Sequence, residues 1–146
     1  MSKKLNPLAP YEWAQKELKS SILEFPGPQN NNPRIVWYHA FTSLRASNDE
    51  VPWCSSFMCA AAESTGFKST RSAAAKSWLT YGEEGTGEPG DIAVFSRGGG
   101  NHVAFIHSKY TKGDKNVLVL GGNQSNAVRS SKYPADRLLA IRRFKA

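Results

Sequence analysis

Cys54 and His102 are the residues in this sequence whose types and positions favour nucleophilic catalysis. Cys54 directly follows Pro52 and Trp53 at the start of an expected helix, where unpaired backbone N–H groups and the helix dipole favour a thiolate. We therefore expect the pKa of Cys54 to lie below its usual value. Cys59 lies among alanines in the same expected helix and is interpreted as a small buried apolar residue. One helix would separate the two cysteines by about 7.5 Å along its axis, so we expect no disulfide.

A thiol nucleophile needs a base, and the sequence contains three histidines. His39 falls in an expected helix, and His107 alternates with apolar residues of an expected strand. His102 follows the glycine-rich stretch 98–101, which leaves room for a ligand beside the ring. Taken alone His102 would still be interpreted as structural, but the expected strand pairing favours His102 as the base.

The expected hairpin of strands 102–108 and 116–120 provides a partner for His102. With its turn near Gly113, the numbers of paired residues sum to about 225, which places Asn123 opposite His102. Directly paired residues have Cβ atoms about 4.5–5.5 Å apart. The amide oxygen of Asn123 would then accept the imidazole N–H and orient the ring. A slip of one residue would place Asn123 on the other face.

The elements that must position these side chains are helices in the first half of the chain and strands in the second. The pattern predicts helices over 10–18, 33–44, 54–66 and 72–79, and strands over 91–96, 102–108, 116–120 and 137–144. Asn32 and Gly66 are the expected caps of the second and third helices. Short connections favour antiparallel pairing, so we expect an α+β fold in which N-terminal helices pack on a C-terminal antiparallel sheet.

Length and charge limit the function classes. A chain of 146 residues forms one domain, and a formal charge of +7 with a pI near 9.6 favours anionic partners. No nucleic-acid motif, secretory signal or apolar run of about 20 residues is present, so we expect neither nucleic-acid binding nor stable membrane insertion. Histidine and cysteine lack zinc spacing, and no calcium loop or cofactor motif is found. No pair of carboxylates suggests a glycan-cleaving enzyme.

Four blocks occur in the order found in CHAP domains: VPWCSSF at 51–57, PGDIAVF at 89–95, GNHVAF at 100–105 and LGGNQS at 120–125. Over about residues 22–143 the sequence thus resembles the cysteine, histidine-dependent amidohydrolases/peptidases, relatives of the NlpC-type and papain-like hydrolases. The resemblance implies a papain-like fold, Cys54 as nucleophile, His102 as base and Asn123 as the orienting residue. Some relatives bind calcium, but this sequence has no aspartate-rich site for it. Many relatives carry glutamate two residues before this asparagine, where this sequence has Gly121. Further substrate contacts are expected from Trp53, Gly100, Asn101 and Gln124.

The resemblance implies cleavage of a peptidoglycan amide bond in the stem peptide, in the cross-bridge or between muramic acid and L-alanine. It is closest to compact phage and prophage endolysins. We therefore expect a monomeric, single catalytic domain over residues 1–146, without a separate wall-binding domain. It would be made in the host cytoplasm and act at the bacterial wall after release. Three alternatives stay open: a non-catalytic wall-binding or virion protein, an exported antibacterial amidase toxin, and an intracellular thiol hydrolase.

Overall fold

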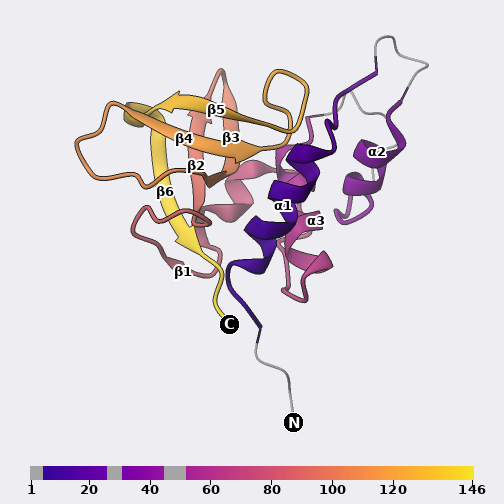
Figure 1. Cartoon of the computed structure of the whole chain (residues 1–146), viewed down its shortest axis with the longest axis horizontal. Helices are drawn as coiled ribbons and strands as arrows, with labels where there is room; N and C mark the ends of the chain where they lie inside the picture. The colour runs from indigo at the N-terminus through magenta and orange to yellow at the C-terminus, as the bar shows by residue number, and fades with distance from the viewer. Residues whose placement is uncertain (1–4, 26–30, 45–51) are drawn as a thin grey trace.

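The computed structural model describes residues 5–25, 31–44 and 52–146. Val51, the first residue of the block at 51–57, lies outside the described residues. Figure 1 shows the helices on one side of the molecule and the strands on the other. The helical elements are α1 (Ala9–Lys19), α2 (Pro33–His39), α3 (Cys54–Ser64), η1 (Ala75–Thr80) and η2 (Ala135–Arg137). The strands are β1 (Glu83–Glu84), β2 (Ile92–Arg97), β3 (Gly100–Ile106), β4 (Asn116–Gly121), β5 (Arg129–Pro134) and β6 (Leu138–Arg143).

The helix caps expected from the sequence are confirmed. The side chain of Asn32 accepts the backbone N–H of Arg34 at 2.9 Å and so caps α2. Gly66 lies two residues after the end of α3 and has a φ of +94°. Glycine adopts this left-handed conformation without a steric penalty, which suits it to end a helix.

Two helices differ from their predicted extents. Helix α2 ends at His39 rather than near residue 44, because the following backbone N–H groups bond three residues back, as from Thr42 to His39. The fourth helix begins at Ala75 rather than Ser72 and is a 3₁₀ helix. The Ser72 hydroxyl accepts the backbone N–H of Ala74, and the Ser72 carbonyl accepts the hydroxyl of Ser55. These bonds hold Ser72 in a turn ahead of the helix.

The sheet has six strands in the order β1-β6-β2-β3-β4-β5, and every neighbouring pair is antiparallel. The predicted α+β class is therefore confirmed. Strand β5 was not expected from the sequence, because its residues, RSSKYP, are largely polar and mostly exposed along the sheet edge. The β3–β4 register agrees with the expected sum, since Phe105 pairs with Leu120 and Ile106 with Val119.

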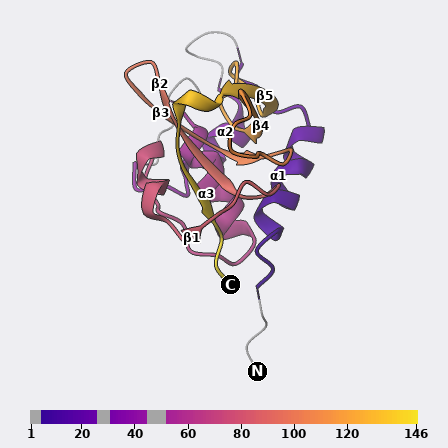
Figure 2. The ribbon, with the colours of Figure 1, turned by 90° about the vertical axis from the view of Figure 1, so that its left-hand side faces the viewer.

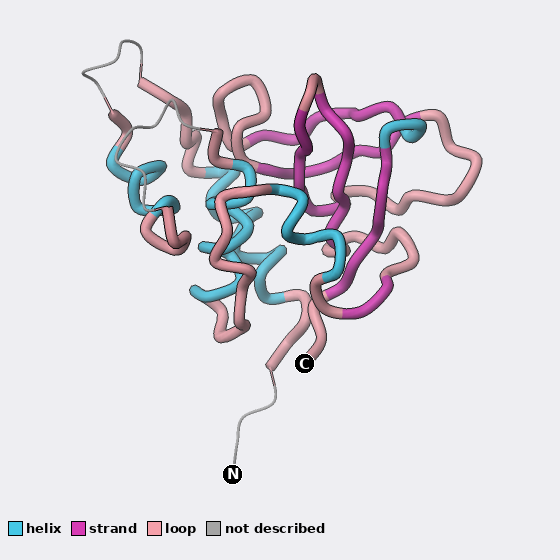
Figure 3. Tube along the Cα trace, turned by 180° about the vertical axis from the view of Figure 1, so that it is seen from behind, coloured by secondary structure: helices cyan, strands magenta, loops and turns pink. Residues whose placement is uncertain are grey.

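Alternating side chains of the central strands enter two different cores. On one face, Ile92, Val94, Val103 and Phe105 pack with the helices, and Figures 2 and 3 show these helices beside the curved sheet. On the other face, Ala93, Phe95, Ala104 and Ile106 form a second cluster with Tyr133 at its border. Helix α3 is buried from Cys54 to Ala62. Each large apolar side chain buried there contributes about 1.5–3 kcal/mol, so the helix start is fixed against the sheet.

Candidate active site

The start of helix α3 is held by the residue that precedes Cys54. Trp53 is fully buried, its Nε1 donates to Glu24 Oε2 at 3.0 Å, and its ring stacks on Tyr38. The chain after β4 comes so close that a Cβ on Gly122 would lie 2.7 Å from the Trp53 ring. Glycine at 122 is thus what lets the end of the sheet approach the helix start.

Cys54 lies at this start with only 6% of its surface exposed. Burial raises the pKa of Cys54, and the opposing influences are weaker: the backbone N–H of Val103, the charge of Arg97, and the N–H groups of Ser55 and Cys54 itself. The expectation of a lowered pKa was therefore wrong. The helix terminus does favour the thiolate, but the cost of removing a charge from water exceeds that effect. Burial thus favours the neutral thiol at Cys54.

A groove of about 550 Å³ opens beside Cys54. It is bordered by the β2–β3 turn, including Gly100 and Asn101, and by the segment before η1. Gly100 and Asn101 therefore line the groove, and their contact with substrate stays a prediction. Trp53 and Gln124, also predicted to contact substrate, are buried with 0% and 1% exposure, so their side chains are not available to a ligand in this groove.

His102 is buried in β3, and both of its ring nitrogens are hydrogen-bonded. Nε2 lies 2.9 Å from Gln124 Oε1, and Nδ1 lies 3.0 Å from Nη1 of Arg97. The amide nitrogen of Gln124 donates to the carbonyl of Arg129 at 2.6 Å and, more weakly, to that of Val119 at 3.4 Å. Because that nitrogen is used, the oxygen faces His102, which requires a proton on Nε2 and a lone pair on Nδ1.

The ring of His102 is kept neutral by its surroundings. The pKa of His102 is lowered to about 4: burial is the largest cause, the charge of Arg97 acts in the same direction, and the Gln124 hydrogen bond opposes them. The ring also stacks on Tyr133, with centroids 4.9 Å apart and an angle of 17° between the planes. At neutral pH His102 is therefore in the form that a general base requires.

Cys54 and His102 come from neighbouring parts of the site without a direct hydrogen bond between them. The backbone N–H of Val103, the residue after His102, points to the Cys54 sulfur. The lone pair on Nδ1, the atom that would accept the thiol proton, is occupied by Arg97. The structure thus brings the thiol to the strand that carries the imidazole, and it places a guanidinium at the basic nitrogen.

The orienting contact to His102 comes from Gln124 rather than from Asn123. The predicted register is correct, but β4 ends at Gly121, so no ladder continues to Asn123. Asn123 has φ +57°, a left-handed conformation that asparagine tolerates better than most residues, and its side chain forms no hydrogen bond to any described residue. The segment LGGNQS at 120–125 contains both amides, and only the end of the strand decides which one reaches the ring.

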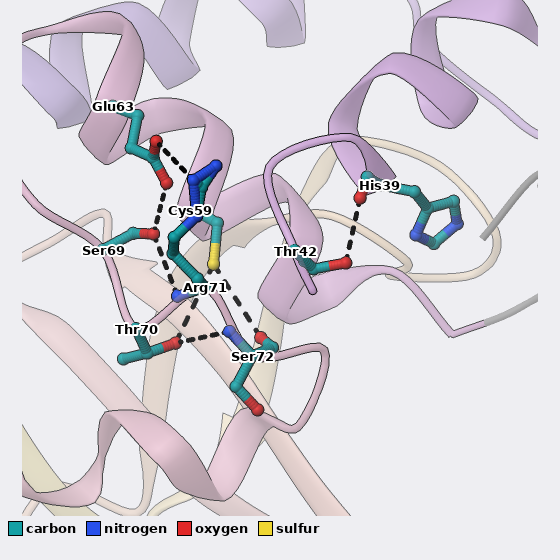
Figure 4. Close-up of polar contacts among 8 residues, drawn as sticks. All are labelled: His39, Thr42, Cys59, Glu63, Ser69, Thr70, Arg71 and Ser72. Carbon is teal, nitrogen blue, oxygen red and sulfur yellow. Dashed lines mark hydrogen bonds and ion pairs between the residues drawn. The ribbon is translucent and has the colours of Figure 1, made fainter. Parts of the chain in front are cut away.

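The other histidines and the second cysteine occupy different surroundings. His39 is buried with Nδ1 at 2.8 Å from Ser56 Oγ, and His107 Nδ1 lies 2.6 Å from the Tyr11 hydroxyl. The Cys59 sulfur lies 3.8 Å from both Thr70 Oγ1 and the Ser72 carbonyl, as Figure 4 shows. Both cysteines are free, as expected. Cys59 is a buried residue whose described contacts include no histidine.

Over the described ranges, no three histidine, cysteine or acidic side chains gather in a group suited to a metal ion. In the same ranges no helix has the length and apolar character needed to cross a membrane.

Comparison with known proteins gives one match. Neither the curated proteins nor the solved structures contain a match to this chain. The family model described as "CHAP domain" matches residues 46–123, more than half of the 146 residues, and the matched segment contains Cys54, His102 and Asn123 but ends one residue before Gln124. CHAP domains form a family of amidases and peptidases that act on peptidoglycan. A cysteine at the start of a buried helix, a neutral histidine on the adjoining strand and this match together show that the chain belongs to the CHAP domain family.

Proposed function

We propose that this protein hydrolyses an amide bond of bacterial peptidoglycan with Cys54 as the nucleophile and His102 as the base. The observation that carries the proposal is the position of Cys54, at the start of α3 and facing the strand of His102, within the segment matched by the family model. The groove beside Cys54 gives a peptide access to this position.

In the proposed reaction, Nδ1 of His102 accepts the Cys54 proton while the sulfur attacks the amide carbonyl. The protonated ring then donates to the leaving amine, and the acyl group remains on sulfur as a thioester. Water, deprotonated by His102, hydrolyses the thioester and regenerates the thiol. The first backbone N–H groups of α3 have no partner within the helix, so the N–H of Cys54 is suited to stabilise the oxyanion.

Gln124 supports this sequence by fixing the tautomer of His102. Its carbonyl oxygen holds the proton on Nε2 and leaves the lone pair on Nδ1. As an uncharged group it stabilises imidazolium less than a carboxylate would. Proton transfer from thiol to imidazole is therefore expected to accompany substrate binding rather than to precede it.

The finer proposal is a monomeric endolysin with a single catalytic domain, made in the host cytoplasm and acting on the wall after release. The formal charge of +7 supports action on an anionic wall polymer, with an attraction that salt weakens.

Digestion of purified peptidoglycan followed by mass analysis tests the proposal. New amino termini within stem peptides or cross-bridges would indicate an endopeptidase, whereas lactyl groups freed of their peptides would indicate a muramoyl-L-alanine amidase. Cys54→Ala is expected to abolish cleavage. Cys59→Ala is expected to retain most of it, because the Cys59 sulfur contacts Thr70 and the Ser72 carbonyl rather than a histidine.

Two results would count against the proposal. Cleavage that persists in Cys54→Ala but stops in a folded Cys59→Ala protein would move the nucleophile to the other cysteine. Binding to sacculi without cleavage by the parent protein would favour a wall-binding role instead.

A further inference from the structure

Arg97 is bonded to the basic nitrogen of His102, and the proposed reaction gives this arginine no role. It is the last residue of β2 and is half-buried, next to the turn formed by Gly98 and Gly99. Its Nη1 donates both to Nδ1 of His102 and to the hydroxyl of Tyr133, each at 3.0 Å. The guanidinium is therefore held at the atom that has to accept the thiol proton.

This contact excludes the thiol from the base. With a proton on Nε2, the neutral ring of His102 has a single lone pair, on Nδ1, and Arg97 uses it. Proton transfer from Cys54 thus requires the guanidinium to leave Nδ1. The same charge also opposes protonation of His102, so its departure favours both the approach of the thiol and the imidazolium that follows.

Among the described residues, Arg97 donates only to neutral acceptors, His102 and Tyr133, whereas a guanidinium bonds most strongly to a carboxylate. Of the described residues that line the groove, Lys76 and Arg97 are basic and none is acidic. The ion pairs formed among the described residues use other cations, namely Arg34, Arg71, Lys109 and Arg143.

The turn beside Arg97 has room to move. Both of its central glycines have positive φ angles, 41° and 80°, as in the tight turns that join adjacent strands. A Cβ on Gly98 or Gly99 would meet nothing within 4 Å. Figure 2 shows the β2–β3 turn projecting from the rest of the sheet, and Arg97 itself lines the groove beside Cys54.

We propose that Arg97 recognises a carboxylate of the substrate peptide beside the scissile amide, and that this exchange of partners frees Nδ1 of His102 for the Cys54 proton. The inference rests on the proposed function and names its substrate class: an acidic peptide rather than a neutral one. In the resting protein Arg97 bonds to the base. In the complex it bonds to the substrate anion, and the proton passes from Cys54 Sγ to Nδ1.

Alkylation of Cys54 tests this recognition without any wall substrate. Iodoacetate carries a carboxylate and iodoacetamide does not, yet both alkylate the sulfur through their CH2 group with loss of iodide. In a Cys59→Ala background, mass spectrometry gives the rate ratio of iodoacetate to iodoacetamide. We expect this ratio to exceed that of free cysteine in the same buffer by about tenfold or more, as for a hydrogen bond to a charged group.

Variants separate a guanidinium contact from general attraction. Arg97→Gln is expected to lower the ratio about tenfold, and Arg97→Lys to lose most of the preference, because an ammonium lacks the planar pair of donors. Arg137→Gln, an exposed cation on η2, is the matched control and should leave the ratio unchanged. An unchanged ratio in Arg97→Gln, or full retention in Arg97→Lys, would overturn the proposal.

Cleavage provides the second measurement. Once digestion has located the scissile bond, two peptides are compared, one with a free carboxylate beside that bond and one with the carboxylate amidated. The parent is expected to favour the acidic peptide about tenfold or more in kcat/KM, and Arg97→Gln to bring the ratio of kcat/KM for the acidic and amidated peptides close to one. Equal cleavage of both peptides by the parent would refute the recognition. If the parent protein does not cleave peptidoglycan, the proposed function is refuted. The alkylation ratio would still decide whether Arg97 recognises a carboxylate.

Discussion

Acidification is expected to destabilise this protein through His102. The folded-state pKa is about 4, whereas an unfolded histidine titrates near 6.5. The unfolded chain therefore binds the proton more tightly, so this contribution to stability is fully present above about pH 6.5 and is lost as the pH falls toward 4. A difference of about 2.5 units corresponds to about 3 kcal/mol in total, of which about 2 kcal/mol is lost by pH 5.

Urea unfolding at pH 7.5 and pH 5 measures this loss. With a slope of about 2 kcal/mol per molar urea for a domain of this size, the midpoint of the parent is expected to fall by about 1 M from His102 alone. His102→Gln is expected to lower stability at pH 7.5 but to show a pH dependence weaker by about 2 kcal/mol. The comparison between parent and variant subtracts the carboxylates, which titrate alike in both proteins.

His107 is the matched control, because burial also lowers its pKa but the ring is less enclosed. His107→Gln should therefore remove a smaller part of the pH dependence. If a folded His102→Gln protein loses as much stability between pH 7.5 and pH 5 as the parent, the neutral buried imidazole is refuted. An NMR titration of the His102 ring in the parent provides an independent measurement, with refutation if the ring protonates near its ordinary pKa.

Four other substitutions follow from the same contacts. Gln124→Ala removes the acceptor of the Nε2 proton of His102, and we expect kcat for wall cleavage to fall about tenfold or more. Asn123→Ala is expected to have a smaller effect, and a larger loss than in Gln124→Ala would return the orienting role to Asn123. Asp91→Asn replaces a carboxylate that accepts three backbone N–H groups by a weaker, uncharged acceptor. Urea unfolding should therefore show a loss of stability of about 1–3 kcal/mol, with wall cleavage retained. Gly122→Ala places a Cβ 2.7 Å from the Trp53 ring and should lower stability by about 1–3 kcal/mol, with a matching fall in Tm. An unchanged Tm would show that the segment after β4 can move away from Trp53 without loss of stability.

Local signals in the sequence predicted much of the fold. Asn32 before Pro33 and Gly66 after α3 act through their own backbone and side chain, so their positions could be inferred without the tertiary structure. The β3–β4 register followed from a turn near Gly113, whose φ of +107° is consistent with that position. Strand β5 has no such signal, because an edge strand does not need apolar residues to pair.

The choice between Asn123 and Gln124 shows where inference from spacing stops. Spacing fixes which residues are opposite only while two strands remain paired, and the β3–β4 pairing ends at Phe105 and Leu120. Beyond that point the chain follows left-handed conformations at Asn123, Ser125 and Asn126. Gln124 lies between them and turns inward, where its longer side chain reaches His102. Neither the pattern of residue types nor the length of the loop predicts that the Gln124 side chain turns inward.

The pKa values of Cys54 and His102 have a consequence for how the site becomes active. Burial raises the first and lowers the second, so a thiolate–imidazolium pair is unfavourable in the resting protein, and a helix terminus alone does not reverse this. A substrate that only filled the groove would bury both groups further and make the pair less favourable still. A substrate that drew the cation of Arg97 away from His102 would instead favour the imidazolium, and the nearby imidazolium would then favour the thiolate. Activation of this site thus depends on the charge that the substrate brings as well as on its shape.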